Sequence, residues 1–214
     1  MLNKFIISLA VLIFIFGGSS VLAQEDATAL DEDIRAQELG VEEPTVLPDS
    51  PLYFFKEWGR GIQGFFTFNP IAKAELKQRF TNEKLIELKK MVEQKKNSER
   101  IEKAIRNYQN EIEEAKKAAE KIKERAEKNE EVGKFLDKFI QHSTLHQRIL
   151  QKLEEQAPPE VFEKIRGARE IHLERFGEVM NKLQGGNKEQ LQERLEKNLQ
   201  EIPGSEFKNF KNLE

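Results

Sequence analysis

The sequence predicts an all-α protein, an elongated helical bundle with coiled-coil-like long helices. Apolar residues recur three and four positions apart over most of residues 51–202, which is the period of an amphipathic helix. Charged residues make up 34% of the chain, as expected for long solvated helix faces. No stretch alternates apolar and polar residues as a half-buried strand does. We expect five or six helices.

Residues 1–23 are typical of a signal peptide. Lys4 precedes an apolar run, Phe5–Phe16, and small residues end at Ala23, where we expect cleavage. The alternative is an uncleaved membrane anchor, because the run extended to Leu22 approaches the roughly 20 apolar residues that span a bilayer. The chain has no Cys, which excludes a lipid-modified cysteine, a disulfide framework and a cysteine nucleophile.

Residues 24–46 carry eight acidic side chains against Arg35 alone, a composition that predicts an acidic disordered tether. A helical domain follows over residues 47–202, and residues 203–214 form a C-terminal tail. Without the signal peptide the chain has 34 basic and 38 acidic residues. This balance excludes nonspecific nucleic-acid binding, which needs a basic field.

The first segment of the helical domain, residues 47–70, is an aromatic motif with seven aromatic residues between Tyr53 and Phe68. Ser50 and Pro51 form a helix start, with Ser50 as the cap. At about 100° per residue, Lys56, Glu57, Arg60 and Gln63 share one face. The opposite face is apolar and consists of Leu52, Phe54, Phe55, Trp58, Ile62, Phe65 and Phe66. We expect it to anchor the protein's own core, which we favour, or to bind a partner.

The bounds of the later helices are predicted from the residues that start or end each of them. Asn69-Pro70 starts a helix that runs to about Lys96, with Asn97-Ser98 as the break after it. A 4–3 apolar seam begins at Ile101 and continues to Ala126. Further helices are expected over 134–155, ended by Pro158-Pro159, and over 160–183, ended by Gly185-Gly186. A last one spans about 188–202.

The segment LPDSPLYFFKEWGRGIQGFFTFNPIAKAEL resembles the start of a domain family of unknown function found in exported prokaryotic proteins. Members share a P-x-S-P-[LF]-Y-x-[FL]-K-x-x-W opening and a later FTF-[ND]-P. The matching residues are Pro48, Ser50–Tyr53, Phe55, Lys56 and Phe66–Pro70, whereas Trp58 lies one position earlier than in the family pattern. The resemblance implies an exported helical domain and no activity.

No motif indicates an enzyme. Gly59–Gly64 has the letters G-x-G-x-x-G, but no strand precedes it as a dinucleotide site requires. His142 and His146 lie four residues apart on one helix face, and with His172 they are weak candidates for metal ligands. We favour a structural role for all three, and Ser143 replaces the glutamate of a H-E-x-x-H site. No serine lies in a nucleophile elbow.

The sequence therefore predicts an exported, non-catalytic interaction module of the cell envelope or exterior, without a cofactor. Its partner is a protein or a second copy of the chain. Membrane contact is expected only through the N-terminal segment or the aromatic helix. The alternative function is an extracytoplasmic bundle that binds a ligand or a metal.

Overall fold

A computed structural model describes residues 34–122, 130–183 and 193 of the chain, and these residues contain helices and no strand. A short 3-10 helix, η1 (Ala36–Leu39), precedes five α-helices. They are α1 (Tyr53–Phe65), α2 (Pro70–Glu93), α3 (Ser98–Glu120), α4 (Glu130–Gln156) and α5 (Pro159–Leu183). The all-α prediction is confirmed. The expected signal peptide, the tether over 24–33, the tail over 203–214 and, apart from residue 193, the helix over 188–202 lie outside the described residues.

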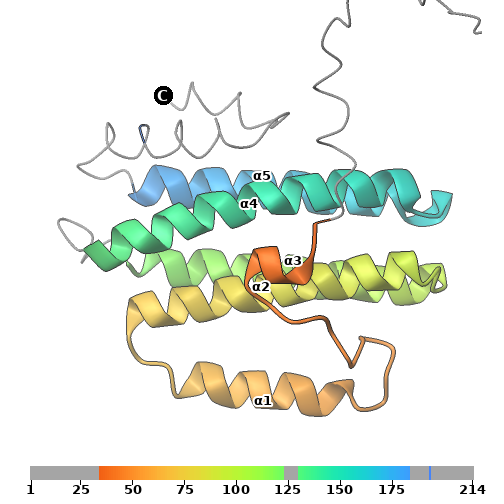
Figure 1. Cartoon of the computed structure of the whole chain (residues 1–214), viewed down its shortest axis with the longest axis horizontal. Coiled ribbons are helices and arrows are strands. Elements are labelled where there is room, and N and C mark those ends of the chain that lie inside the picture. Colours follow the sequence, from red (N-terminus) through yellow and green to blue (C-terminus); the bar gives the residue numbers. More distant parts are fainter. Residues whose placement is uncertain (1–33, 123–129, 184–192, 194–214) are drawn as a thin grey trace, which may run out of the picture.

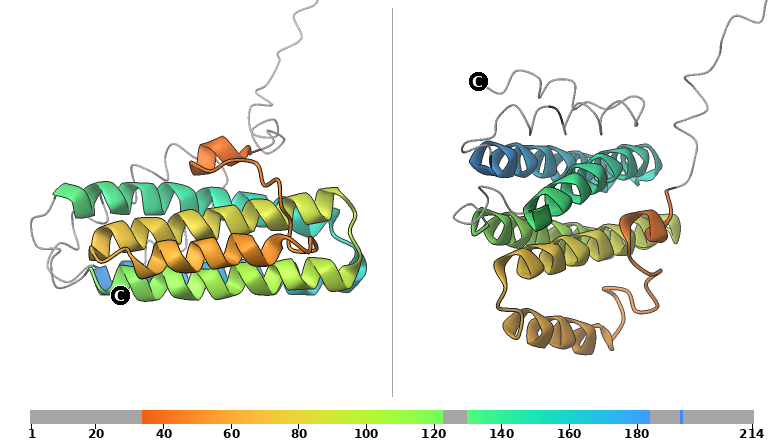
Figure 2. Two further views of the ribbon diagram at one scale, coloured as in Figure 1. Left: turned by 90° about the horizontal axis from the view of Figure 1, so that it is seen from below. Right: turned by 60° about the vertical axis from the view of Figure 1, so that its left-hand side comes forward.

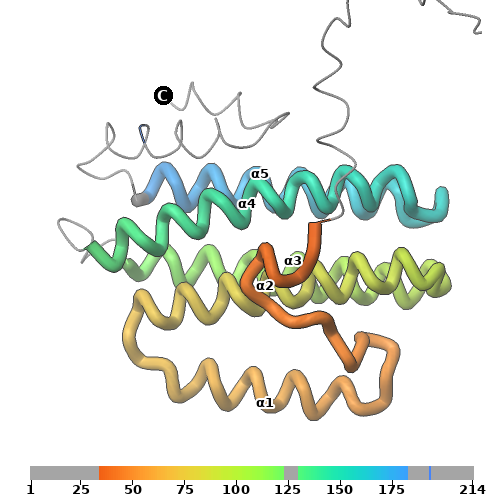
Figure 3. The backbone as a smooth tube through the Cα atoms, in the orientation of Figure 1, coloured from red at the N-terminus to blue at the C-terminus, as the bar shows by residue number. Residues whose placement is uncertain are grey.

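Four of the helices form an antiparallel bundle with up-and-down connections (Figures 1 and 3). α2 and α3 make one layer and α4 and α5 the other, and α2 packs on both α3 and α4. α1 lies outside this bundle as a third layer, beside α2 and along its length (Figure 2). No helix within the described ranges is both long and apolar enough to cross a membrane.

Local chemistry sets the starts of α2 and α3 where the sequence predicts them. Asn69 caps α2, since its Oδ1 accepts hydrogen bonds from the backbone N–H groups of Ile71 and Ala72, and Pro70 occupies the first turn. Asn97 caps α3 in the same way through the N–H of Arg100. The expected Ser50 cap is wrong for α1: Ser50 Oγ accepts a bond from the N–H of Leu52, but the helix begins at Tyr53 with Leu52 at its N-cap position.

The bundle interior is divided into two apolar clusters along its length. One cluster joins the second half of α2 to the first half of α3, the second half of α4 and the first half of α5, with Tyr108 and Leu150 fully buried. The other lies at the opposite end and includes Phe135, Ile140 and Phe176. The seam residues from Ile101 to Ala119 of α3, and Ile122 just after it, are buried, as predicted.

The expected tether is wrong for residues 34–46. Ile34, Ala36, Leu39 and Val41 are buried in the first cluster, and η1 packs on α2. Gly40 ends η1 with φ of 66°, a backbone conformation that glycine adopts without strain. This acidic segment also contains these four apolar residues, spaced two or three positions apart, and they are enough to pack it on the bundle. We call residues 34–41 the N-terminal strap.

Candidate functional site

The apolar side of α1 points into solvent and not into the bundle. Among the described residues, the exposed large apolar side chains all lie between positions 52 and 68, and Trp58 is 63% exposed. We call this set the aromatic face; it consists of Leu52, Phe54, Phe55, Trp58, Ile62, Phe65, Phe66 and Phe68. The favoured expectation, that these side chains anchor the protein's own core, is therefore wrong. Sequence reasoning also missed Phe68, which is 80% exposed.

The polar side of α1 faces the bundle because α2 offers it charged partners. Glu87 of α2 is fully buried and accepts hydrogen bonds from Tyr53 Oη at 2.5 Å, from Lys56 Nζ at 2.6 Å and from Arg60 Nη2 at 3.1 Å. Arg60 also pairs with Glu83, and Lys84 Nζ bonds to Glu57 at 2.5 Å. We call these seven residues the ionic network of α1: Tyr53, Lys56, Glu57, Arg60, Glu83, Lys84 and Glu87.

The ionic network is balanced in charge, with three cations and three carboxylates around one phenol. Burial raises the pKa of Tyr53 well above its usual value and the charge of Glu87 adds to the shift, so Tyr53 stays protonated and donates to Glu87. Burial opposes the charge on Arg60, but Glu87 and Glu83 outweigh it and raise the pKa of Arg60. A buried charge is tolerated only when it is paired in this way. The network therefore fixes which side of α1 faces outward.

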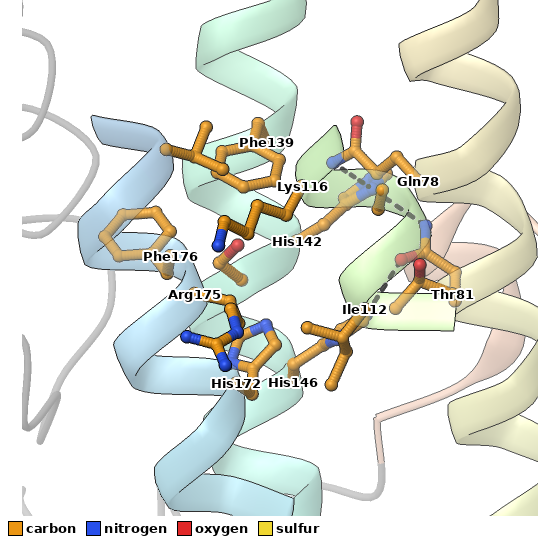
Figure 4. A pocket seen from close by; sticks show the side chains of 14 residues that line it. Gln78, Thr81, Ile112, Lys116, Phe139, His142, His146, His172, Arg175 and Phe176 are labelled. Atoms are coloured by element: carbon orange, nitrogen blue, oxygen red, sulfur yellow. Dashed lines mark hydrogen bonds between the residues drawn. The ribbon is translucent and has the colours of Figure 1, made fainter. Parts of the chain in front are cut away.

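A second polar site lies inside the bundle, between the two apolar clusters. We call it the histidine layer (Figure 4): it brings together side chains from α2, α3, α4 and α5. His142, His146 and His172 are all part of it, and the ring centroids of His146 and His172 are 4.9 Å apart. The other members are Gln78, Thr81, Asn82, Tyr108, Ser143 and Gln147.

Backbone carbonyls set the direction of the hydrogen bonds in the histidine layer. Asn82 Nδ2 donates to the carbonyl of Leu39 at 2.8 Å and to His142 Nδ1 at 2.9 Å, which leaves Asn82 Oδ1 as an acceptor. His146 Nε2 donates to that oxygen at 2.8 Å. The remaining nitrogen of His146, Nδ1, then accepts from Tyr108 Oη at 3.0 Å. This arrangement requires a neutral His146.

All three histidines are held neutral. Burial lowers the pKa of His142 to about 4 and that of His172 to about 3. Burial also lowers the pKa of His146 well below its usual value, with smaller contributions from His172 and His142. Neutral imidazoles accept hydrogen bonds here from Asn82, Tyr108 and Gln147. The layer is therefore built for uncharged rings at neutral pH.

The histidine layer borders a partly open cavity of about 30 Å³, which is room for one or two water molecules and not for an organic ligand. Within residues 34–122 and 130–183, no three His, Asp or Glu side chains are arranged to hold one metal ion. His142 and His146 do share a face of α4, as predicted, but both nitrogens of His146 are engaged by protein groups.

A larger groove reaches the same layer from outside. It has a volume of about 480 Å³ and opens between the strap, α2 and α4, where Leu39, Arg79, Lys138 and His142 line it. Gln78, Asn82 and His142 belong to both the groove and the inner cavity. Sequence reasoning missed this groove because the strap that forms one wall was expected to be disordered.

One comparison with known proteins places the chain in a family. The family model DUF5667, a domain of unknown function, matches residues 45–204. The chain belongs to this family. The DUF5667 match begins before α1 and covers the whole bundle, whereas the strap lies ahead of it. The expected likeness to a domain family of unknown function is thereby confirmed. No curated protein and no solved structure matches the chain.

Proposed function

We propose that this DUF5667 protein is an exported, non-catalytic module that attaches to another surface through the aromatic face. The observation that carries the proposal is the orientation of α1. Six aromatic side chains and two aliphatic ones point away from the bundle. Free aromatic side chains expose about 150–250 Å² each, so the face leaves on the order of 1,000 Å² open. The largest apolar patch of a typical monomer is about 300–600 Å².

The balance of charges on α1 supports a docking role. An amphipathic helix normally turns its apolar side inward, and here a buried ionic network holds it the other way. The network commits Lys56, Arg60 and Glu57 to the bundle and leaves the aromatic face without a charge. Such a face contributes nothing to the stability of the isolated domain, and it gains free energy only when something covers it.

Cysteine labelling tests export and docking together, because the chain has no native Cys. We expect Phe65→Cys to react with a membrane-impermeant maleimide in dilute purified protein and to be protected in intact cells. The control is Glu99→Cys, an exposed position at the start of α3, which should react in both settings. An unreactive control in intact cells would contradict export, and an equally reactive Phe65→Cys would contradict an occupied face.

The groove beside His142 favours a second candidate, a bundle that binds a small ligand. Its volume of about 480 Å³ lies in the usual range for ligand pockets, about 300–1,000 Å³. Its walls combine polar side chains such as Gln78 and Asn82 with apolar ones such as Leu39 and Leu76, which suits a ligand that has both polar and apolar groups. Protein recovered from its native host and analysed by mass spectrometry under non-denaturing conditions should then carry a bound mass. Elemental analysis of the same sample tests for a metal.

A further inference from the structure

We propose that the surface bound by the aromatic face is a lipid bilayer, with α1 lying in the headgroup boundary parallel to the membrane plane. This inference rests on the proposed function, because it names the surface to which the module attaches. α1 has 13 residues and is therefore about 20 Å long, too short to span a bilayer whose apolar core is about 30 Å thick. It can lie on the membrane but cannot cross it.

The breadth of the aromatic face favours a planar surface over a single helix of another protein. At about 100° per residue, the five positions of the face within α1 cover a sector of roughly 100°, and Leu52 at the N-cap extends it to roughly 160°. A helix that pairs with one other helix buries a narrower seam. The face also continues past the end of α1 through Phe66 and Phe68, which are 67% and 80% exposed. A bilayer accommodates such a broad row without a matching shape.

The composition of α1 agrees with an interfacial helix. Such helices have a strongly apolar side with Trp, Phe and Leu and a charged side, and their overall hydrophobicity is low. Trp58 lies near the centre of the aromatic face, and aromatic rings favour the boundary between headgroups and acyl chains. The charged side chains of α1 lie on the side that faces α2, where Arg60 is buried and Lys56 and Glu57 are 25% and 40% exposed, so seating the opposite face in lipid removes no charged group of α1 from water.

The same chain carries a second apolar segment, Phe5–Phe16, of the kind that enters membranes during export. If this segment stays in the bilayer, residues 17–33 connect it to the strap. Seventeen residues reach at most about 55–60 Å when extended. Packed helices generally lie about 8–10 Å apart, so a connection of this length exceeds the thickness expected for three helix layers. Insertion of Phe5–Phe16 into a bilayer and contact of the aromatic face with the same bilayer are therefore geometrically compatible.

The test uses the chain from Gln24 to Glu214, which retains every described residue, with phosphatidylcholine vesicles. Trp58 is the sole tryptophan and reports directly on the face. We expect its emission to shift to the blue on adding vesicles and to be quenched by lipids brominated on the acyl chain. Phe54→Ser with Phe65→Ser should weaken vesicle binding at least about tenfold. Phe162→Ser, a half-buried aromatic residue on α5, is the matched control and should bind normally.

Binding should depend little on salt or on anionic lipid, because Lys56 and Arg60 are already paired with carboxylates. Binding that disappears at high salt and survives the double substitution would overturn the inference. The inference would also be overturned if Trp58 emits as a fully solvated tryptophan and vesicles do not shift its emission. A dimer in analytical ultracentrifugation that the double variant abolishes, without vesicle binding, would assign the face to a second copy. That result would overturn the lipid inference and leave the proposed function intact.

Discussion

The histidine layer makes the folded protein sensitive to mild acid at the level of single residues. His142, His146 and His172 are neutral in the fold, with pKa values of about 4 for His142 and about 3 for His172. In the unfolded chain each titrates near its ordinary value of about 6.5. Protonation below that value therefore favours the unfolded state, and the stabilising effect of neutral rings is complete only above it.

We predict that the free energy of unfolding falls as the pH drops from 7.5 to 5.5. Each neutral buried histidine should cost about 1.4 kcal/mol at pH 5.5, or about 4 kcal/mol for the three together. Urea titrations at several pH values measure this loss. The decline should continue toward pH 4, where the first folded-state pKa is reached. His172→Gln should make the slope shallower by about one third, whereas a stability independent of pH over this range would refute the assignment.

Glu87 is the residue that holds α1 to the bundle. It is fully buried and bonds to Tyr53, Lys56 and Arg60 together. Removing one partner of a buried ionic cluster costs about 3–5 kcal/mol, since the remaining charges stay desolvated. In this protein α1 can relieve that cost by detaching into water. A lost charge at Glu87 should therefore loosen α1 before it unfolds the bundle.

We predict that Glu87→Gln lowers the hydrogen-exchange protection of α1 amides by about 100-fold or more. The α3 and α5 amides should change much less. Glu114→Gln is the control, because Glu114 pairs with Lys117 on the surface, where such pairs contribute about 0–1 kcal/mol. Equal losses of protection in α1 and α3 would mean that the ionic network supports the whole bundle and not α1 in particular.

At the scale of helices, the sequence predicts well where a helix begins and ends, and poorly which side of it faces the bundle. Asn69-Pro70 and Asn97 predict helix starts correctly because a capping side chain bonds to backbone N–H groups only a few residues away. Which side of α1 faces inward depends instead on Glu83, Lys84 and Glu87, which are more than twenty residues away along the chain. The rule that apolar faces are buried gives the wrong answer here. A useful signal was available, because those three charges complement Lys56, Glu57 and Arg60.

The histidine layer was missed for a related reason. The apolar pattern of α4 is interrupted at His142, Ser143 and His146, which by itself is typical of a solvated flank. The structure buries this interruption because α2 has its own polar residues, Gln78, Thr81 and Asn82, at the same level of the bundle. Two polar stretches that face each other satisfy one another's hydrogen bonds. Periodicity within one helix does not reveal that match.

Two glycines of different helical elements should respond oppositely to alanine. Gly167 lies within α5, and a Cβ there would meet nothing within 4 Å, so Gly167→Ala should raise stability by about 0.5–1 kcal/mol. Gly40 has equal space but a φ of 66°, and Gly40→Ala should lower stability by about 1 kcal/mol. Urea midpoints of the two variants measure both effects. A gain at position 40 would contradict the left-handed end of η1.

At the scale of the whole molecule, the folded unit begins earlier than the family match. The match starts at residue 45, but the strap contributes Ile34 and Leu39 to the first apolar cluster. The carbonyl of Leu39 also accepts a bond from Asn82, which connects the strap to the histidine layer. Lys89 Nζ donates to the carbonyl of Ile34 at 2.9 Å. The strap therefore closes one side of the bundle and one wall of the groove.

We predict that a chain starting at Glu42 is less stable than one starting at Gln24 by at least about 2 kcal/mol. Leu39 alone is 1% exposed, and losing a buried leucine side chain costs about 2–5 kcal/mol. The shorter chain also leaves the Asn82 amide with one bond fewer, which disturbs the neighbouring His142 and His146. Removing this wall of the groove exposes His142 to water and brings its pKa back toward the ordinary value, so the difference in stability between the two chains should shrink as the pH falls toward 5.5. Urea denaturation of both chains at pH 7.5 and 5.5 measures this, with a chain starting at Asp33 as the control that keeps the strap. Equal midpoints for the chains starting at Gln24 and Glu42 would show that the strap is not part of the cooperative fold.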